Sequence, residues 1–399
     1  MPTASDRSLD ALMEELTAEP IEAARARSEG EFGRIAGPFE RRIVIHGTGH
    51  LGGLALAGLR HAGIEPLAFC DNNARMWGTQ KDGVTVLSPA EAAKRYKDSA
   101  AFVVAIYNPS APRAQLRALG CCIVPYPVLF WKHWSCMPAE YRLELPHRIL
   151  EKAREMPAGY ELLSDDKSRR EFVAQVRWRC LLDYDCLPPA DNASEMYFPP
   201  DLFALRPDEV FVDCGAYDGD SIRTFLHVSE GRFARICAWE ADAINCNALE
   251  RYRASLAPDV ASRIQILPYA VGSAESKLRF ATAGTVGSRL VDAGETEVEC
   301  RRIDGELACA GPTLIKMDIE GAEPDALRGA AVTMAESRPV MAVCAYHKCE
   351  HLWEIPQLLK SANPDYHVFL RRYAEDCWET VYYAVPPERF KSIEGSIHR

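Results

Sequence analysis

A strand, a glycine turn and a helix follow one another twice in this chain, and this pattern constrains the fold more than any other feature. It occurs in "RIVIHGTGHLGGLALAGLRHAGIEPLAFCD" (residues 42–71) and again in "EVFVDCGAYDGDSIRTFL" (residues 209–226). Further strand-like and helix-like runs alternate after each turn, which is typical of parallel sheets with helical crossovers. We therefore predict an α/β protein with two doubly wound Rossmann-like domains. The last two β runs, at 366–373 and 379–386, are predicted to form an antiparallel hairpin at a sheet edge.

The predicted organisation has four parts. Residues 1–40 form a helical segment with one helix over 8–34, and residues 41–130 form a Rossmann-like nucleotide-binding domain. Residues 131–204 lack a repeat of strands and are predicted to be a helical linker. Residues 205–399 form the second α/β domain.

Composition and charge exclude some classes of function. A net charge of −11 disfavours a general nucleic-acid binder, which is normally basic. We find no apolar run near the roughly 20 residues that span a bilayer, and no signal-peptide pattern at the N-terminus. The fourteen cysteines include no C-x-x-C pair, so we expect a reduced, cytoplasmic protein.

The second glycine turn is acidic. Asp213 ends a strand, Gly215 and Gly219 permit a tight turn, and Glu240 ends the next strand, where it could accept hydrogen bonds from a ribose diol. The acids of this turn would repel a pyrophosphate and attract a cation, such as the sulfonium and ammonium groups of S-adenosylmethionine. The alternative is that the turn only joins a strand to a helix.

A second group of acids follows the apolar strand in "LIKMDIEGAE" (314–323). Asp318 and Glu320 are expected at the same sheet edge as the glycine turn, whereas Glu323 is expected to stabilise a helix N-terminus. His347 follows another strand and is a candidate base, because an imidazole has a pKa near 6.5; its alternative role is a hydrogen-bonded loop histidine. Asp318, Glu320 and His347 could also hold a metal ion, although we expect a metal-free site.

The segments "FVDCGAYDGDS", "WEAD", "YAVG", "IKMDIEGAE" and "AYHKCEHLWEIP" resemble the FkbM family of S-adenosylmethionine-dependent methyltransferases over about residues 205–385. The resemblance implies a class I methyltransferase fold for 205–399 and O-methylation of sugars and related metabolites. It implies catalytic roles for Asp318, Glu320 and His347. The cofactor contacts that it implies are Asp213, Gly215, Ala216, Tyr217, Gly219, Glu240, Ala270 and Asp318. A loop at 282–294 could line the acceptor pocket through Ser288 and Arg289, or could be a solvated hairpin loop.

The first glycine turn contains a full G-x-G-x-x-G pattern, formed by Gly47, Gly49 and Gly52, and the next strand ends in Asp71. In a strand–turn–helix context this pattern indicates dinucleotide binding. The domain is thus predicted to bind NAD or a nucleotide-sugar. It could instead be a degenerate Rossmann unit that docks or dimerises, and its resemblance to Rossmann-like domains of sugar-modifying enzymes is one of fold alone.

The function that best fits these features is an S-adenosylmethionine-dependent O-methyltransferase that acts on a sugar or glycan hydroxyl. Its partners would be a small-molecule or glycan substrate, with no nucleic acid and no transmembrane segment, and a homo-oligomer remains open. The alternatives are an NAD-dependent sugar oxidoreductase, which leaves the acidic turn unexplained, and a non-catalytic nucleotide-binding protein.

Overall fold

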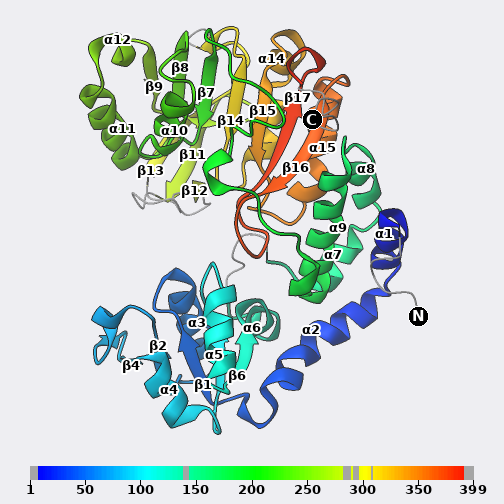
Figure 1. The fold of residues 1–399 in the computed structure, drawn as a ribbon, viewed down its shortest axis with the longest axis vertical. Coiled ribbons are helices and arrows are strands. Elements are labelled where there is room, and N and C mark those ends of the chain that lie inside the picture. Colours follow the sequence, from blue (N-terminus) through cyan, green and yellow to red (C-terminus); the bar gives the residue numbers. More distant parts are fainter. Residues whose placement is uncertain (1–7, 138–142, 282–288, 291–295, 307–308, 391–399) are drawn as a thin grey trace, which may run out of the picture. The chain divides into compact units, whose positions relative to one another are not determined.

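The computed structural model of the chain describes residues 8–137, 143–281, 289–290, 296–306 and 309–390 (Figure 1). The chain divides into two compact units. The N-terminal unit comprises Met1–Arg154, Val173–Pro189 and Ala374–Trp378, and the C-terminal unit comprises Glu155–Phe172, Ala190–Tyr373 and Glu379–Arg399. Residues 131–204, predicted as a linker, are therefore shared between the two units. Within the described residues, no helix is both long and apolar enough to cross a membrane.

The N-terminal unit contains a six-stranded sheet in the order β3-β4-β2-β1-β5-β6. All neighbouring strands are parallel except β3 and β4, which are antiparallel. The strands are β1 Ile43–His46, β2 Ala68–Cys70, β3 Gln80–Lys81, β4 Val84–Leu87, β5 Ala101–Val104 and β6 Cys122–Pro125. The helices are α1 Leu9–Thr17, α2 Ile21–Ala36, α3 His50–His61, α4 Pro89–Tyr96, α5 Ser110–Ala118, α6 Tyr126–His133 and α7 Pro146–Glu151, together with the C-terminal half of α9 Asp166–Leu181.

Alternate side chains of this sheet enter two separate apolar cores. Ile43 and Ile45 pack with α3 and α6, whereas Val44 packs with α4 and α5 on the opposite face. Successive side chains of a strand point to opposite faces, so strands buried on both sides are apolar throughout. Helices therefore cover both faces of the sheet, and the strand order reverses between β1 and β5.

The single helix predicted over residues 8–34 is wrong. The structure has two helices, α1 and α2, separated at Pro20. Proline lacks a backbone N–H and disfavours the helical conformation of the residue before it, so α1 ends ahead of Pro20 and α2 begins directly after it.

The C-terminal unit contains a seven-stranded sheet in the order β16-β17-β15-β14-β7-β8-β9. The strands are β7 Val210–Cys214, β8 Arg235–Trp239, β9 Ile264–Leu267, β14 Leu314–Met317, β15 Val340–Cys344, β16 His367–Arg372 and β17 Thr380–Val385. A smaller sheet has the order β10-β13-β11-β12, with β10 Ala270–Val271, β11 Ser276–Ala281, β12 Arg289–Leu290 and β13 Thr296–Arg301. The helices are α8 Met156–Glu161, α10 Asp220–Val228, α11 Ala243–Ser255, α12 Pro258–Ala261, α13 Glu323–Arg328, α14 Ala331–Glu336 and α15 His351–Ala362, together with the N-terminal half of α9.

The large sheet places one crevice at its centre. Strands β7, β8 and β9 succeed one another to one side and β14 and β15 to the other, so the strand order reverses between β7 and β14. In open α/β sheets the ligand crevice lies beyond the carboxyl ends of the strands at such a reversal. Strand β17 pairs antiparallel with both β15 and β16. This confirms the predicted α/β class, the doubly wound architecture and the edge hairpin.

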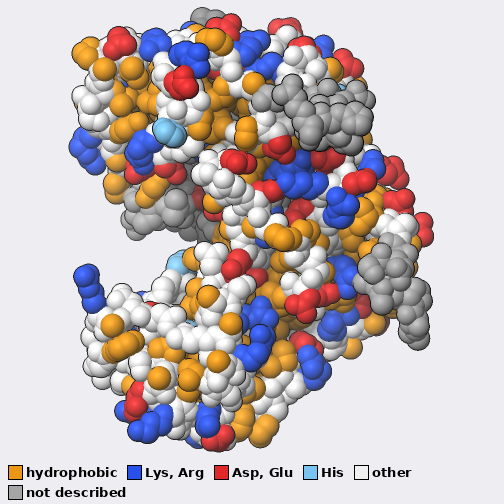
Figure 2. All heavy atoms as spheres, in the orientation of Figure 1, with side chains coloured by type: hydrophobic (Ala, Val, Ile, Leu, Met, Phe, Trp, Pro, Cys, Tyr) orange, Lys and Arg blue, Asp and Glu red, His pale blue; other side chains and the backbone are white. Residues whose placement is uncertain are grey.

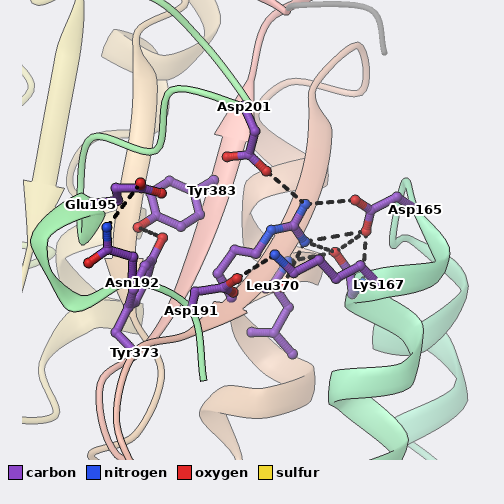
Figure 3. Close-up of polar contacts among 11 residues, drawn as sticks. Asp165, Lys167, Asp191, Asn192, Glu195, Asp201, Leu370, Tyr373 and Tyr383 are labelled. Carbon is purple, nitrogen blue, oxygen red and sulfur yellow. Dashed lines mark hydrogen bonds and ion pairs between the residues drawn. The ribbon is translucent and has the colours of Figure 1, made fainter. Parts of the chain in front are cut away.

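A polar network ties the start of α9 to β16 within the C-terminal unit (Figure 3). Arg371 Nη2 lies 2.7 Å from Asp165 Oδ2 and 3.9 Å from Asp201 Oδ2. Ser168 Oγ accepts a hydrogen bond from Leu370 N at 2.9 Å. Because the Arg371 side chain is only 3% exposed, its charge needs these partners.

Acidic and basic side chains are intermixed over the face shown in Figure 2, with apolar side chains between them. Among the described residues on that face there is no extended basic patch. This distribution agrees with the net charge of −11.

Candidate active site

The acidic glycine turn after β7 packs directly against the end of β14. Gly215 has a φ of 80°, and a Cβ at this position would lie 1.9 Å from the Asp318 carbonyl oxygen. Both Gly215 N and Ala216 N donate to the Trp239 carbonyl oxygen at the end of β8. Only glycine fits this close approach, which brings the ends of three strands together.

Glu240, which follows β8, accepts hydrogen bonds from this turn. Its Oε2 receives Tyr217 N at 2.8 Å and its Oε1 receives Asp242 N at 2.7 Å. Burial raises the pKa of Glu240, and the two backbone N–H groups only partly oppose that rise. Each carboxylate oxygen can accept a second hydrogen bond, so Glu240 retains capacity to bind a diol.

Asp213 lies below the turn rather than on it. Its carboxylate is fully buried, with Oδ1 3.1 Å from Lys316 Nζ and Oδ2 bonded to the Ser221 hydroxyl. Burial raises the pKa of Asp213 against the opposing charge of Lys316. Lys316 in turn donates to the Gly215 carbonyl oxygen at 2.7 Å, so this buried ion pair holds the turn from beneath.

The remaining predicted cofactor residues border the same edge of the sheet. Gly219 has a φ of 90°, and a Cβ there would lie 2.8 Å from the Tyr252 ring on α11. Gly219 therefore permits close packing of α11 against the turn. Ala270 is buried and follows the carboxyl end of β9, the neighbour of the strand that leads to Glu240.

Two tyrosines orient Asp318 at the end of β14. The hydroxyl of Tyr197 donates to Asp318 Oδ2 at 2.8 Å, and that of Tyr346 donates to Oδ1 at 3.3 Å. The Asp318 side chain retains 23% exposure. Burial and the charge of Asp318 hold the pKa of both hydroxyls well above 10, so both remain protonated donors.

His347 lies among three carboxylates. Its Nε2 is 3.4 Å from Asp318 Oδ1 and 3.6 Å from Glu320 Oε2, and its Nδ1 is 2.8 Å from Glu323 Oε1. Burial lowers the pKa of His347, but Glu323, Asp318 and Glu320 outweigh it and raise the pKa to about 9. The structure thus brings together all three residues that were predicted to be catalytic.

Glu323 lies in the first turn of α13, as predicted, but its carboxylate does more than stabilise that helix. It is fully buried, accepts Ile319 N at 2.9 Å and contacts His347, and its Oε2 is 3.5 Å from His351 Nδ1. Burial raises the pKa of Glu323, yet the two histidines and the backbone N–H outweigh it and lower the pKa to about 2. Glu323 therefore positions the His347 ring.

Four residues of this site were not predicted from the sequence. The only sequence sign of Lys316 is that it is a lone cation in an apolar strand. The only sign of Tyr346 is its place next to His347. Tyr197 has no sequence signal, since it precedes Asp318 by 121 residues. Glu379, at the start of the last strand run, is partly buried, and this burial, together with the charge of Asp318, raises its pKa to about 7.

The crevice thus has two chemically different ends. At one end, the Glu240 carboxylate faces the turn where a ribose would lie. At the other end, two carboxylates and the His347 imidazole gather beside the end of β14. The second group can orient a hydroxylated molecule and remove a proton. The predicted loop contacts Ser288 and the Arg289 side chain lie outside the described residues.

The glycine turn of the N-terminal unit repeats part of this design. Gly47 has a φ of 109°, and a Cβ at Gly52 would lie 2.0 Å from the Gly47 carbonyl oxygen, whereas Gly49 has open space around it. Asp71 accepts Thr48 N at 2.8 Å and Asn73 N at 2.8 Å, much as Glu240 accepts two backbone N–H groups. The structure therefore brings all four predicted residues to the carboxyl ends of β1 and β2.

Two further side chains border this N-terminal turn. Trp77 donates from Nε1 to the Asp71 carbonyl oxygen at 2.7 Å and is 46% exposed. His46 is fully buried, and neither ring nitrogen has a hydrogen-bond partner in the described part of the chain. Burial lowers the pKa of His46 to about 4, so its ring is neutral near pH 7.

Comparison with known proteins finds a family model that matches part of the chain. Residues 213–377 match the methyltransferase FkbM domain. The fold is similar to that of methyltransferase FkbM from Methylobacillus flagellatus KT, with a TM-score of 0.76 and 24% identity over 96% of this chain and 99% of that one. At this identity the likeness establishes the fold. No curated protein matches the sequence.

Two further solved structures are much less similar. UDP-D-quinovosamine 4-dehydrogenase from Vibrio fischeri has a TM-score of 0.19 and 21% identity, covering 21% of this chain and 76% of that one. Precorrin-6y C5,15-methyltransferase from Geobacter metallireducens GS-15 has a TM-score of 0.29 and 14% identity, covering 45% and 80%.

Proposed function

We propose that the protein is an S-adenosylmethionine-dependent O-methyltransferase acting on a sugar or glycan hydroxyl, since residues 213–377 match the methyltransferase FkbM domain. This match supports a methyltransferase and implies use of S-adenosylmethionine. The acceptor class is our proposal. The observation that carries it is the gathering of Asp318, Glu320 and His347 at the end of β14, beside the acidic turn.

In this proposal the acidic turn binds the cofactor. Glu240 accepts hydrogen bonds from the ribose hydroxyls, while the backbone from Gly215 to Tyr217 and Ala270 line the same side. Asp213 acts indirectly, because Lys316 connects its buried charge to the Gly215 carbonyl oxygen. The negative charges around the crevice favour the sulfonium cation and disfavour pyrophosphate ligands.

The acceptor is proposed to lie against Asp318, Glu320 and His347. Methyl transfer is an in-line displacement, so the protein must mainly align the acceptor oxygen with the methyl carbon. A sugar presents adjacent hydroxyl groups that can bind two carboxylates at once. The same groups take up the hydroxyl proton as the new bond forms. This chemistry uses Asp318, Glu320 and His347 together, and the oxidoreductase and non-catalytic alternatives leave their gathering unexplained.

The proposal is tested by product analysis. The full chain is incubated with methyl-deuterated S-adenosylmethionine and a panel of nucleotide-sugars, free sugars and oligosaccharides, and the products are read by mass spectrometry. A deuteromethyl group on a sugar oxygen supports the proposal, provided that Asp318→Asn abolishes it. Methylation confined to non-carbohydrate acceptors in a matched panel would overturn the acceptor class and leave the methyltransferase assignment intact.

We further propose that the N-terminal unit binds a nucleotide-containing ligand at Gly47, Gly49, Gly52 and Asp71. Three features support this: the open space at Gly49, the acid at the end of β2, and the exposed ring of Trp77 beside that acid, suited to stacking on a base. NAD and nucleotide-sugars are the two ligand classes proposed. The alternative role for this unit is docking or dimerisation.

A further inference from the structure

We propose that Asp318, Glu320 and His347 bind a divalent metal ion at the acceptor end of the crevice. The inference deepens the proposed function and rests on it for the role of the ion. Binding of the ion can nevertheless be measured without any turnover. The three residues come from two neighbouring strand ends, β14 and β15, which the parallel pairing of Met317 with Val343 holds side by side.

The two separations around His347 Nε2 are close to those of atoms that share a cation. Asp318 Oδ1 lies 3.4 Å away and Glu320 Oε2 lies 3.6 Å away. Both exceed the 2.7–3.2 Å typical of an N–H···O hydrogen bond. Two ligand atoms that each lie about 2.1 Å from one ion are roughly 3.0–3.5 Å apart in octahedral or tetrahedral geometry.

The other ring nitrogen is held as metal-binding histidines require. His347 Nδ1 is 2.8 Å from Glu323 Oε1, a hydrogen-bond distance, so Nδ1 keeps a proton directed at Glu323. In the ion-bound state Nε2 would give up its own proton and offer its lone pair to the ion. Ile319 N fixes Glu323 from behind at 2.9 Å. A carboxylate that receives the distal N–H of a ligating histidine is the usual support of a metal site.

Glu323 could itself be counted among the ligands, because atoms of Asp318, Glu323 and His347 lie within 4.8 Å of one another. We assign Glu323 to the supporting role since it meets the opposite nitrogen of the ring from Asp318. Glu320 completes the ligand set instead. Its φ of 59° is unfavourable for a non-glycine residue, and such strain is often retained where a side chain must be held for function.

The donor set selects the kind of ion. One imidazole nitrogen with two carboxylate oxygens suits a borderline ion such as Mn²⁺ better than Mg²⁺, which prefers oxygen alone. Such an ion would polarise the acceptor hydroxyl and ease loss of its proton. In the methyl transfer, the acceptor oxygen forms a bond to the methyl carbon as the carbon–sulfur bond breaks. The electron pair of the broken bond stays on sulfur, and the hydroxyl proton passes to a neighbouring carboxylate.

The test is calorimetric titration of Mn²⁺ into the chelator-treated full chain, with Mg²⁺ and Zn²⁺ titrated alongside. One Mn²⁺ per chain is expected, with the electron paramagnetic resonance signal of free Mn²⁺ decreasing as it binds. Glu320→Gln and His347→Ala should weaken binding at least tenfold, and Glu323→Gln about 10–100-fold. Asp325→Asn is the matched control, because this exposed carboxylate on the same segment pairs with Arg328 and should leave binding unchanged.

Thermal melting and S-adenosylmethionine binding are recorded for every variant, so a folding defect in one variant does not decide the outcome. Glu320→Gln removes only a partly exposed charge and is therefore the decisive variant. Absence of Mn²⁺, Mg²⁺ and Zn²⁺ binding at millimolar concentration in the wild type would overturn the inference, as would binding that Glu320→Gln leaves unchanged. If methylation persists at the wild-type rate after chelation, the role of the ion in polarising the acceptor is refuted while the proposed function stands. Metal binding without methylation of any sugar would refute the function alone.

Discussion

At the scale of single residues, Asp318 depends on a tyrosine that lies before the matched family domain. Tyr197 donates its hydroxyl to Asp318 Oδ2 and its backbone N to the Tyr383 hydroxyl at 2.9 Å. Its φ of 71° places it in the left-handed region. Residues outside 213–377 therefore contribute to the site that the family domain defines.

Tyr197→Phe should lower kcat about 10–100-fold while leaving S-adenosylmethionine affinity within about twofold. The reason is that a hydrogen bond to a charged group contributes about 1.5–3 kcal/mol, and this one orients the acceptor-side carboxylate. Tyr366→Phe is the matched control, since its buried hydroxyl donates to the Pro339 carbonyl oxygen. Steady-state kinetics that show equal kcat for both variants would refute the role of Tyr197.

Removing one partner of the buried Lys316–Asp213 ion pair should lower the free energy of unfolding more than neutralising both partners together. Lys316→Met leaves the Asp213 charge buried without its cation, which should lower the free energy of unfolding by about 3–5 kcal/mol. The double variant Lys316→Met/Asp213→Asn should recover part of that loss. Denaturant unfolding measures both values, and additive losses in the double variant would contradict a coupled pair.

At the scale of elements, the contact of α9 with β16 depends on one carboxylate. Burial raises the pKa of Asp165, but the hydrogen bond and charge of Arg371 outweigh it, and the net pKa is lowered. A carboxylate with a lowered folded-state pKa stabilises the fold above its unfolded pKa of about 3.9, and this stabilisation is lost as the pH falls through the folded value.

Asp165→Asn should therefore destabilise the chain by about 1.5–3 kcal/mol at pH 7, and the difference from the wild type should shrink as the pH falls below about 4. Denaturant unfolding at pH 7, 5 and 3.5 measures it. Asp166→Asn serves as the control, because its carboxylate is 72% exposed. A difference that stays constant down to pH 3.5 would show that charge plays no part in this contact.

The sequence predicts the site residues at the strand ends better than it predicts the residues that orient them. Asp213, Glu240, Asp318 and His347 each follow an apolar run, and parallel strands bring such positions to one edge, so their assembly followed from pattern alone. Tyr197 could not be predicted, since tertiary packing over 121 residues places its hydroxyl. Pro20 signals the break between α1 and α2, but the apolar periodicity on either side of it favoured one continuous helix.

At the scale of the whole molecule, the N-terminal unit should bind a nucleotide when the full chain is tested. Thermal shift with NAD, NADP, UDP-sugars and GDP-sugars at millimolar concentration is expected to raise Tm for one class. Gly49→Val should remove that shift and leave Tm without ligand close to the wild type, because a Cβ at Gly49 meets nothing within 4 Å but blocks approach of a phosphate. No shift with any ligand would favour docking or dimerisation.

The central claim is that the C-terminal unit holds S-adenosylmethionine at Glu240, and calorimetry of the full chain tests it most directly. We predict one molecule bound per chain, with Glu240→Gln weakening affinity about 10–150-fold through loss of hydrogen bonds to a charged acceptor. Glu250→Gln, an exposed carboxylate on α11, should bind like the wild type. Equal affinity for the wild type and Glu240→Gln, with both proteins folded, would contradict the account.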